Sequence, residues 1–150
     1  MYTNDIALYP TIDGLGESHF SLREFENRAG WVMIHPSVVN SLHQTRAGLN
    51  ATSRDGEVEV LITDCVRTPQ QLAALGSKYG WTDEGGKVAR RSFHLFEFGG
   101  VAVDFKARYK KNYIYLPAHT VYAVTKLYFD YAKYYDDGHV HGDNRSQVNR

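Results

Sequence analysis

Two segments of the chain place histidines and an aspartate among apolar residues. SFHLFEFGGVAVDF contains His94 and Asp104, and HVHGD contains His139 and His141. An ionised side chain in apolar surroundings is costly unless it is paired or bound to a cation. Two histidines and one carboxylate, with a fourth coordination position left open, are typical of hydrolytic zinc sites, where zinc lowers the pKa of its bound water to about 7. The alternative is structural: the first histidine lies in a turn, the aspartate ends a strand and the HVH run forms a surface strand.

Capping signals and the spacing of apolar residues predict the elements that would hold these side chains. Ser21 followed by Glu24 is a capping box, which opens a short helix. Further helices are predicted after Pro36, over residues 69–78 and, as a long helix, over residues 117–134. Strands are predicted over residues 57–63, 101–105 and 139–143, residues 92–105 read as a strand pair, and a glycine-rich loop is expected at residues 85–86. This mixture predicts an α+β fold, with helices packed on a small antiparallel sheet that carries the candidate metal site.

Length and composition limit the class of protein. The chain has 150 residues and a formal net charge of zero, which favours one domain, 1–150, and gives no reason to expect a nucleic acid partner. The single cysteine, Cys65, excludes an intramolecular disulfide and most sulfur-based metal sites. No apolar run approaches the roughly 20 residues of a membrane helix, and the N-terminus lacks a secretory signal pattern. We therefore expect a protein made in the cytoplasm and not inserted in a membrane; its oligomeric state stays open.

The order of several short motifs resembles that of a known peptidase group. The motifs are Ser92-x-His94, Gly100-x-Ala102-Val103-Asp104 and His141-x-Asp143-x-Arg145, with HFSLREFENR and LITDCVRTP earlier in the chain. Together they resemble the zinc peptidases of the D-Ala-D-Ala carboxypeptidase and L-Ala-D-Glu endopeptidase superfamily. That superfamily includes murein endopeptidase, many phage endolysins and the Hedgehog signalling domain. The similarity runs from about residue 19 to residue 145, and it implies the fold of that superfamily.

The resemblance also implies a set of metal ligands and their neighbours. His94, Asp104 and His141 match the zinc ligands, and His139 matches a residue beside the metal that handles protons. A competing alignment makes His139 the third ligand and Asp136, three positions earlier, the general base. The longer match, which includes the residues after His141, favours His141 as the ligand. Arg67 matches an arginine that binds a carbonyl or carboxylate oxygen of the substrate, a task suited to its paired N–H donors.

The activity that the resemblance implies is hydrolysis of peptidoglycan stem peptides with Zn²⁺ as cofactor. A lysis protein of a phage, released to the cell wall by a separate membrane pore, and a cytoplasmic dipeptidase both fit the sequence. Ser92 either binds substrate or caps a turn. The alternative function is a non-catalytic wall-binding or virion structural module of the same fold.

One departure from the family pattern lies beside the first expected ligand. The family usually has six residues between the histidine and the aspartate, whereas LFEFGGVAV places nine between His94 and Asp104. The Gly-x-Ala-x-Asp half is intact, so the three surplus residues lie next to His94. A bulged turn over residues 96–99 would absorb them, because Gly99 and Gly100 permit unusual dihedral angles. Without such a turn, the first ligand would be displaced from the metal.

Overall fold

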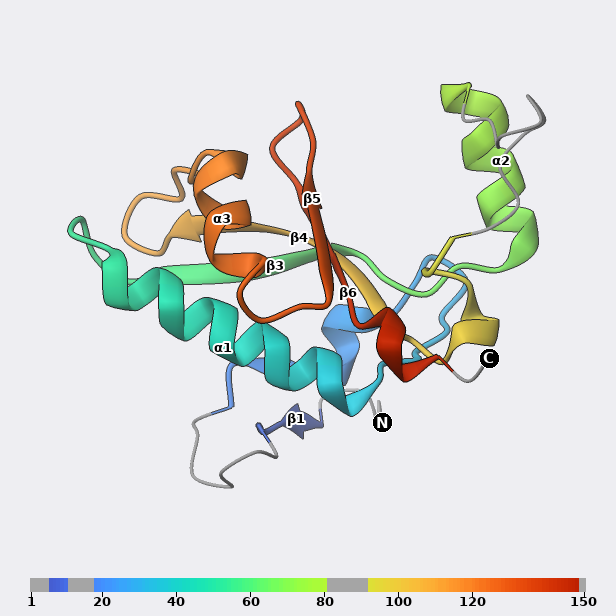
Figure 1. Cartoon of the computed structure of the whole chain (residues 1–150), viewed down its shortest axis with the longest axis horizontal. Coiled ribbons are helices and arrows are strands. Elements are labelled where there is room, and N and C mark those ends of the chain that lie inside the picture. The colour runs from blue at the N-terminus through green and yellow to red at the C-terminus, as the bar shows by residue number, and fades with distance from the viewer. Residues whose placement is uncertain (1–5, 11–17, 81–91, 149–150) are drawn as a thin grey trace.

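A four-stranded antiparallel sheet, in the strand order β3-β4-β6-β5, is the frame of the fold (Figure 1). The computed structural model describes residues 6–10, 18–80 and 92–148. The strands are β1 (Ala7–Leu8), β2 (Phe20–Ser21), β3 (Val58–Asp64), β4 (Ala102–Tyr109), β5 (Tyr131–Tyr134) and β6 (Val140–Asp143), and the α-helices are α1 (Pro36–Thr52), α2 (Pro69–Tyr79) and α3 (Ala118–Thr125). Three short 3₁₀ helices are η2 (Leu22–Phe25), η3 (Phe96–Phe98) and η4 (Arg145–Gln147). Within the described ranges these elements make an α+β fold with two antiparallel sheets, as the sequence predicts.

The two faces of the large sheet have different chemistry. Phe105 on β4 lies opposite Val140 on β6, and both are fully buried in a core that also takes apolar side chains from α1 and α3. Asp104 lies opposite His141, one residue along each strand. Because side chains alternate between the faces of a strand, this second pair lies on the face that the core helices leave uncovered. Register therefore brings two of the expected ligands together.

The helices α1 and α2 follow the predicted signals. Pro36 is the first residue of α1, and the side chain of His35 accepts a hydrogen bond from the backbone of Ser37. Thr68 and Gln71 form a capping box at the start of α2, and Gly80 ends that helix in the left-handed conformation. Figure 1 shows α2 standing away from the large sheet, whereas α1 runs along it.

The expected helix over residues 117–134 is wrong beyond its first half. The helix α3 ends at Thr125, a turn follows, and Tyr131–Tyr134 form the edge strand β5. Leu127, which helical spacing would bury, is 69% exposed. The β-prone aromatic run instead pairs with β6, placing Lys133 opposite His141. The pairing with β6 stabilises the strand more than the local apolar spacing favours a helix. Because β6 is a separate segment, the spacing within residues 126–134 does not reveal this pairing.

The expected strand pair over residues 92–105 is also wrong. His94 lies in a turn, and Leu95 forms a single parallel bridge with Arg67. The helix η3 follows, and Gly99 and Gly100 both have left-handed dihedrals, with φ of 78° and 76°. Only β4 is a true strand in this segment, so the first histidine is held by a turn and not by a strand.

Two further predictions are the glycine-rich loop and the absence of a membrane helix. The loop at residues 85–86 lies outside the described residues. Over the described ranges, no helix combines the length and apolar character needed to cross a membrane.

Candidate metal centre

Three buried side chains from distant parts of the chain point one ligand atom each at a common centre. His94 Nε2 lies 3.1 Å from Asp104 Oδ1 and 3.0 Å from His141 Nδ1, and the last two atoms are 3.0 Å apart. The three residues are each less than 10% exposed. This near-equilateral triangle could hold a metal ion, as the sequence predicts.

The hydrogen bond that the outer nitrogen of each ring makes determines the tautomer of that ring. His94 Nδ1 donates to the backbone carbonyl of Cys65 at 2.6 Å, and His141 Nε2 donates to the carboxylate of Asp143 at 2.7 Å. A carbonyl and a carboxylate only accept, so the two outer nitrogens carry the protons when the rings are neutral. The inner nitrogens then face Asp104 with lone pairs. Three acceptors around one point require a cation or a proton between them.

The pKa values of Asp104 and His141 are both shifted in the direction that favours the charged form of the side chain. Burial alone would raise the pKa of Asp104, but when the inner nitrogens carry protons in place of a metal, the charge of His94 and hydrogen bonds from both rings hold that pKa well below its usual range. Burial lowers the pKa of His141, but hydrogen bonds to Asp104 and Asp143 outweigh this and raise it. The centre therefore attracts positive charge and keeps its carboxylate ionised.

The dimensions of the triangle fit a small divalent ion. In a tetrahedral site with bonds of about 2.0–2.1 Å, ligand atoms lie about 3.4 Å apart, so an opening of about 0.3 Å per edge would admit zinc. Two imidazoles and a carboxylate suit zinc and several other divalent transition metals. Each ring also has the outer hydrogen bond that orients metal-binding histidines. The residues present thus fit a metal with three protein ligands.

The turn that carries His94 is fastened at several points. The Ser92 hydroxyl oxygen accepts a hydrogen bond from the His94 backbone N–H at 3.2 Å, so Ser92 caps the turn. The Arg67 backbone N–H donates to the His94 carbonyl at 2.7 Å. The helix η3 and the two left-handed glycines take up the surplus residues before β4. The longer spacing therefore leaves His94 next to Asp104.

Behind His141, a second group of side chains fixes Asp143. Asp143 is fully buried, and both of its oxygens accept hydrogen bonds of 2.8 Å from Arg145. The guanidinium carbon of Arg145 lies 4.0 Å from the ring centroid of Tyr131 and 4.5 Å from that of Phe93. Burial would raise the pKa of Asp143, but Arg145 and His141 hold it below its usual value. The carboxylate is therefore ionised and oriented toward His141.

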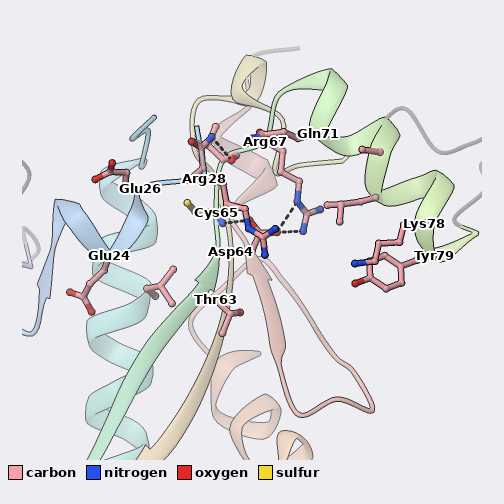
Figure 2. Close-up of a pocket in the computed structure, with 15 residues that line it drawn as sticks. Glu24, Glu26, Arg28, Thr63, Asp64, Cys65, Arg67, Gln71, Lys78 and Tyr79 are labelled. Carbon is pink, nitrogen blue, oxygen red and sulfur yellow. Dashed lines mark hydrogen bonds and ion pairs between the residues drawn. The ribbon is translucent and has the colours of Figure 1, made fainter. Parts of the chain in front are cut away.

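Arg67 lies between the metal centre and a cavity. Its guanidinium binds Asp64 and lies 3.5 Å from Asp104 Oδ2. The cavity, of about 380 Å³, is lined by the end of β3, by residues 24–28 and by α2. Figure 2 shows Arg67 and Asp64 in the middle of this lining, with Lys78 and Tyr79 on the α2 side. Arg67 thus connects the metal centre to a space that a ligand can enter.

His139 lies on the other side of Asp104. Its Nε2 is 3.8 Å from Asp104 Oδ2, and its Nδ1 and backbone N–H both bind Asp137. The ring stacks on Tyr135, with centroids 4.2 Å apart and planes 9° apart. Asp137 accepts a hydrogen bond from the Nδ1–H of His139, so in the neutral ring Nε2 has a lone pair that faces the centre.

The residue named by the competing alignment lies apart from this group. Asp136 is exposed, and no hydrogen bond or salt bridge joins it to His139 or His141 within residues 92–148. Besides Asp104, the carboxylate that contacts His139 is Asp137, which the sequence reasoning did not select. Its proximity follows from the turn before β6, and spacing alone gave no signal for it.

Comparison with known proteins gives no relative: no protein-family model, no curated protein and no solved structure matches the chain. The resemblance to zinc peptidases therefore rests on the short motifs. The buried His94, Asp104 and His141 group stands on its own geometry.

Proposed function

We propose that the chain is a zinc-dependent peptidase that hydrolyses stem peptides of peptidoglycan. The observation that carries this proposal is the triangle of three acceptor atoms, with the far side of both imidazoles already hydrogen-bonded. Zinc bound there supplies an activated water for attack on a peptide carbonyl. The motif order over residues 19–145 supports the choice of a peptidase of the D-Ala-D-Ala carboxypeptidase and L-Ala-D-Glu endopeptidase type.

Arg67 has the position of a residue that binds the substrate. Its side chain reaches Asp104 on one side and lines the cavity on the other. A guanidinium stabilises negative charge that develops on a carbonyl oxygen, and it also binds a peptide carboxylate. We assign the substrate to the cavity shown in Figure 2, with its scissile carbonyl toward Arg67.

His139 has the position of a proton acceptor. The contact with Asp137 leaves the Nε2 lone pair directed at the centre, and stacking on Tyr135 holds the ring plane. A general base must lie within hydrogen-bond reach of the proton it takes, directly or through one water. The Nε2 of His139 lies 3.8 Å from Asp104 Oδ2, which supports His139 in this role, whereas Asp136 is exposed and does not contact the group.

The competing function is a non-catalytic wall-binding or virion structural module of the same fold. Under that function the longer spacing after His94 would mark a decayed site. The turn, η3 and the two glycines argue against decay, because they accommodate the surplus residues with the ligand atoms still about 3 Å apart.

A metal-exchange assay on defined muropeptides tests the proposal. The protein is stripped with a chelator, and the release of peptide or amino acid products is followed by mass spectrometry before and after zinc is added. We expect activity only with zinc. Arg67→Ala should lower kcat/KM by roughly 10²–10³-fold, the usual loss for one oxyanion-stabilising donor. Arg46→Ala, which removes a surface pair with Glu57, is the matched control and should keep full activity. Equal wall binding with and without zinc, and no hydrolysis in either state, would favour the binding module.

A further inference from the structure

Beyond the metal centre, three exposed hydrophobic side chains, two of them aromatic, lie at the far end of β4. Tyr113 is 63% exposed, Ile114 59% and Tyr115 50%. They belong to the turn after β4, in which Tyr115 forms a bridge with Arg108 and the Asn112 side chain accepts a hydrogen bond from the Ile114 backbone. A well-bonded turn thus presents these side chains to solvent instead of folding them inward.

The rings are fixed by cations from β4. The Arg108 guanidinium carbon lies 4.5 Å from the Tyr113 ring centroid and 5.9 Å from that of Tyr115, and Lys106 Nζ lies 5.4 Å from the Tyr115 centroid. A cation within about 6 Å of a ring centroid is attracted to the ring face, so these contacts favour the ring orientations seen here. The two tyrosines therefore form a preorganised surface, which we name the tyrosine platform (Tyr113 and Tyr115).

The backbone of the platform is strained. Tyr113 has φ of 60°, and it is the sole non-glycine residue with positive φ in the described ranges. A bulky residue rarely adopts this conformation, and glycine would adopt it freely. Strain of this kind is typical of positions where a side chain serves a ligand.

The platform lies on the same sheet face as the metal centre. Asp104, Lys106 and Arg108 alternate along β4, so their side chains share one face, and Tyr115 is paired with Arg108. Four residues of strand separate Asp104 from Arg108, which corresponds to about 13 Å. One extended polymer chain can contact both places.

The charges around the platform indicate what kind of polymer fits. Arg108 Nε binds Glu59 at 2.6 Å, and Lys110 Nζ lies 3.8 Å from Glu57. Glu59 and Glu57 thus offset two of the four basic side chains in residues 106–111, and a nucleic acid backbone would need such side chains unpaired. Exposed tyrosine faces beside paired charges and hydrogen-bonding groups suit a sugar chain. The axial C–H groups of a pyranose ring pack on the electron-rich aromatic face, and the sugar hydroxyls bind nearby polar groups.

We propose that Tyr113 and Tyr115 form a carbohydrate-binding platform that holds the glycan strand of the cell wall next to the metal centre. The identity of the glycan rests on the proposed function; the platform itself rests on the surface described above. The peptide attached to the bound strand would then reach the metal centre along the face of β4.

Binding measured without hydrolysis tests the platform. The chelator-treated full chain is sedimented with purified peptidoglycan sacculi, and it is titrated with a tetramer of β-1,4-linked N-acetylglucosamine while amide shifts are followed by NMR. We expect shifts centred on residues 106–115. The double variant Tyr113→Ala/Tyr115→Ala should bind at least 10-fold more weakly. Tyr113→Phe should bind like the wild type, and so should the control Tyr9→Ala, which removes another tyrosine that is 60% exposed.

Tyr113→Gly separates binding from folding. It removes the ring and relieves the positive φ, so it should weaken binding without lowering the melting temperature. Unchanged binding in the double variant, no binding by the wild type, or tighter binding of a poly-dT decamer than of the sugar would each overturn the platform. Hydrolysis of a sugar-free stem peptide, which the double variant should perform at the wild-type rate, reports separately on the proposed function.

Discussion

At the scale of single residues, the tautomers of two histidines carry the account. His94 and His141 each donate their outer N–H to a fixed acceptor, so the inner nitrogens of the neutral rings meet Asp104 as lone pairs. Sequence spacing suggested the three residues, but it could not show the acceptors behind them. The carbonyl of Cys65 directly follows β3, 29 residues before His94, and meets that ring only in the folded chain, whereas the carboxylate of Asp143 lies on β6 with His141.

The first prediction separates the two histidines of the HVH run. His141→Ala should remove zinc and activity together, because two remaining ligands hold zinc weakly. His139→Ala should keep the metal and slow turnover by roughly 10²–10⁴-fold, the usual loss for a general base. Elemental analysis of both purified variants, with single-turnover rates, checks this. Full metal in His141→Ala would contradict the ligand assignment, and a metal-free His139→Ala would favour the other alignment.

The second prediction concerns the carboxylate behind His141. Asp143→Asn removes the charge that orients the ring, so zinc affinity should fall by about 10–100-fold. Asp130→Asn is the control, because Asp130 binds Ser146 at the end of the same region and does not contact a ligand. Competition with a chromogenic chelator gives both affinities. Equal affinities for the two variants would show that Asp143 does not support the metal.

At the scale of elements, the segment between His94 and β4 decides whether the first ligand is in place. Gly99 and Gly100 have nearly the same positive φ but different surroundings. A Cβ on Gly99 would meet nothing within 4 Å, whereas one on Gly100 would lie 2.7 Å from the carbonyl carbon of Met33. The Gly100 carbonyl also accepts a hydrogen bond from the backbone of His35, at the start of α1.

The third prediction uses this matched pair of glycines. Gly99→Ala should cost about 1 kcal/mol of unfolding free energy from backbone strain alone. Gly100→Ala should cost at least about twice as much and also weaken zinc binding, because the segment must move away from the backbone of Met33 and Ile34, which precede α1. Urea unfolding and zinc titration of both variants measure these effects. Equal losses in the two variants would mean that the contact with Met33 does not position the turn.

The fourth prediction reports on the end of β3, which supplies the acceptor for His94. Cys65 is 2% exposed, its thiol donates to the carbonyl of Phe25, and burial raises its pKa to about 11. The thiolate is the reactive form, so at pH 8 only about one thiol in a thousand is ionised, compared with roughly a quarter for an ordinary cysteine. A disulfide reagent should therefore label the folded protein far more slowly than the urea-unfolded one, and the folded rate should rise as pH approaches 11. Rapid labelling at pH 8 would show that β3 and η2 separate readily.

At the scale of the whole molecule, local sequence patterns predicted the elements whose conformation depends mainly on neighbouring residues. The caps of α1 and α2, the strands around β3 and β6, and the α+β class follow from capping residues and alternation. The aromatic run after Thr125 was misassigned because its pairing partner, β6, confers the strand conformation from outside the segment. The strand pair expected around His94 was wrong for a similar reason: His94 lies in the turn that the structural alternative named, and Arg67 and Ser92 hold that turn in place. Asp137, which acts through His139, carries no spacing signal of its own.

Zinc X-ray absorption of the zinc-loaded full chain tests the central claim most directly. We expect one zinc per chain, with two imidazole nitrogens and one or two oxygens at about 2.0–2.1 Å and no sulfur near 2.3 Å. His94→Ala should abolish this signal. A chain that binds no zinc, or a zinc shell that contains sulfur or lacks imidazole, would contradict the assignment of His94, Asp104 and His141 as the metal centre.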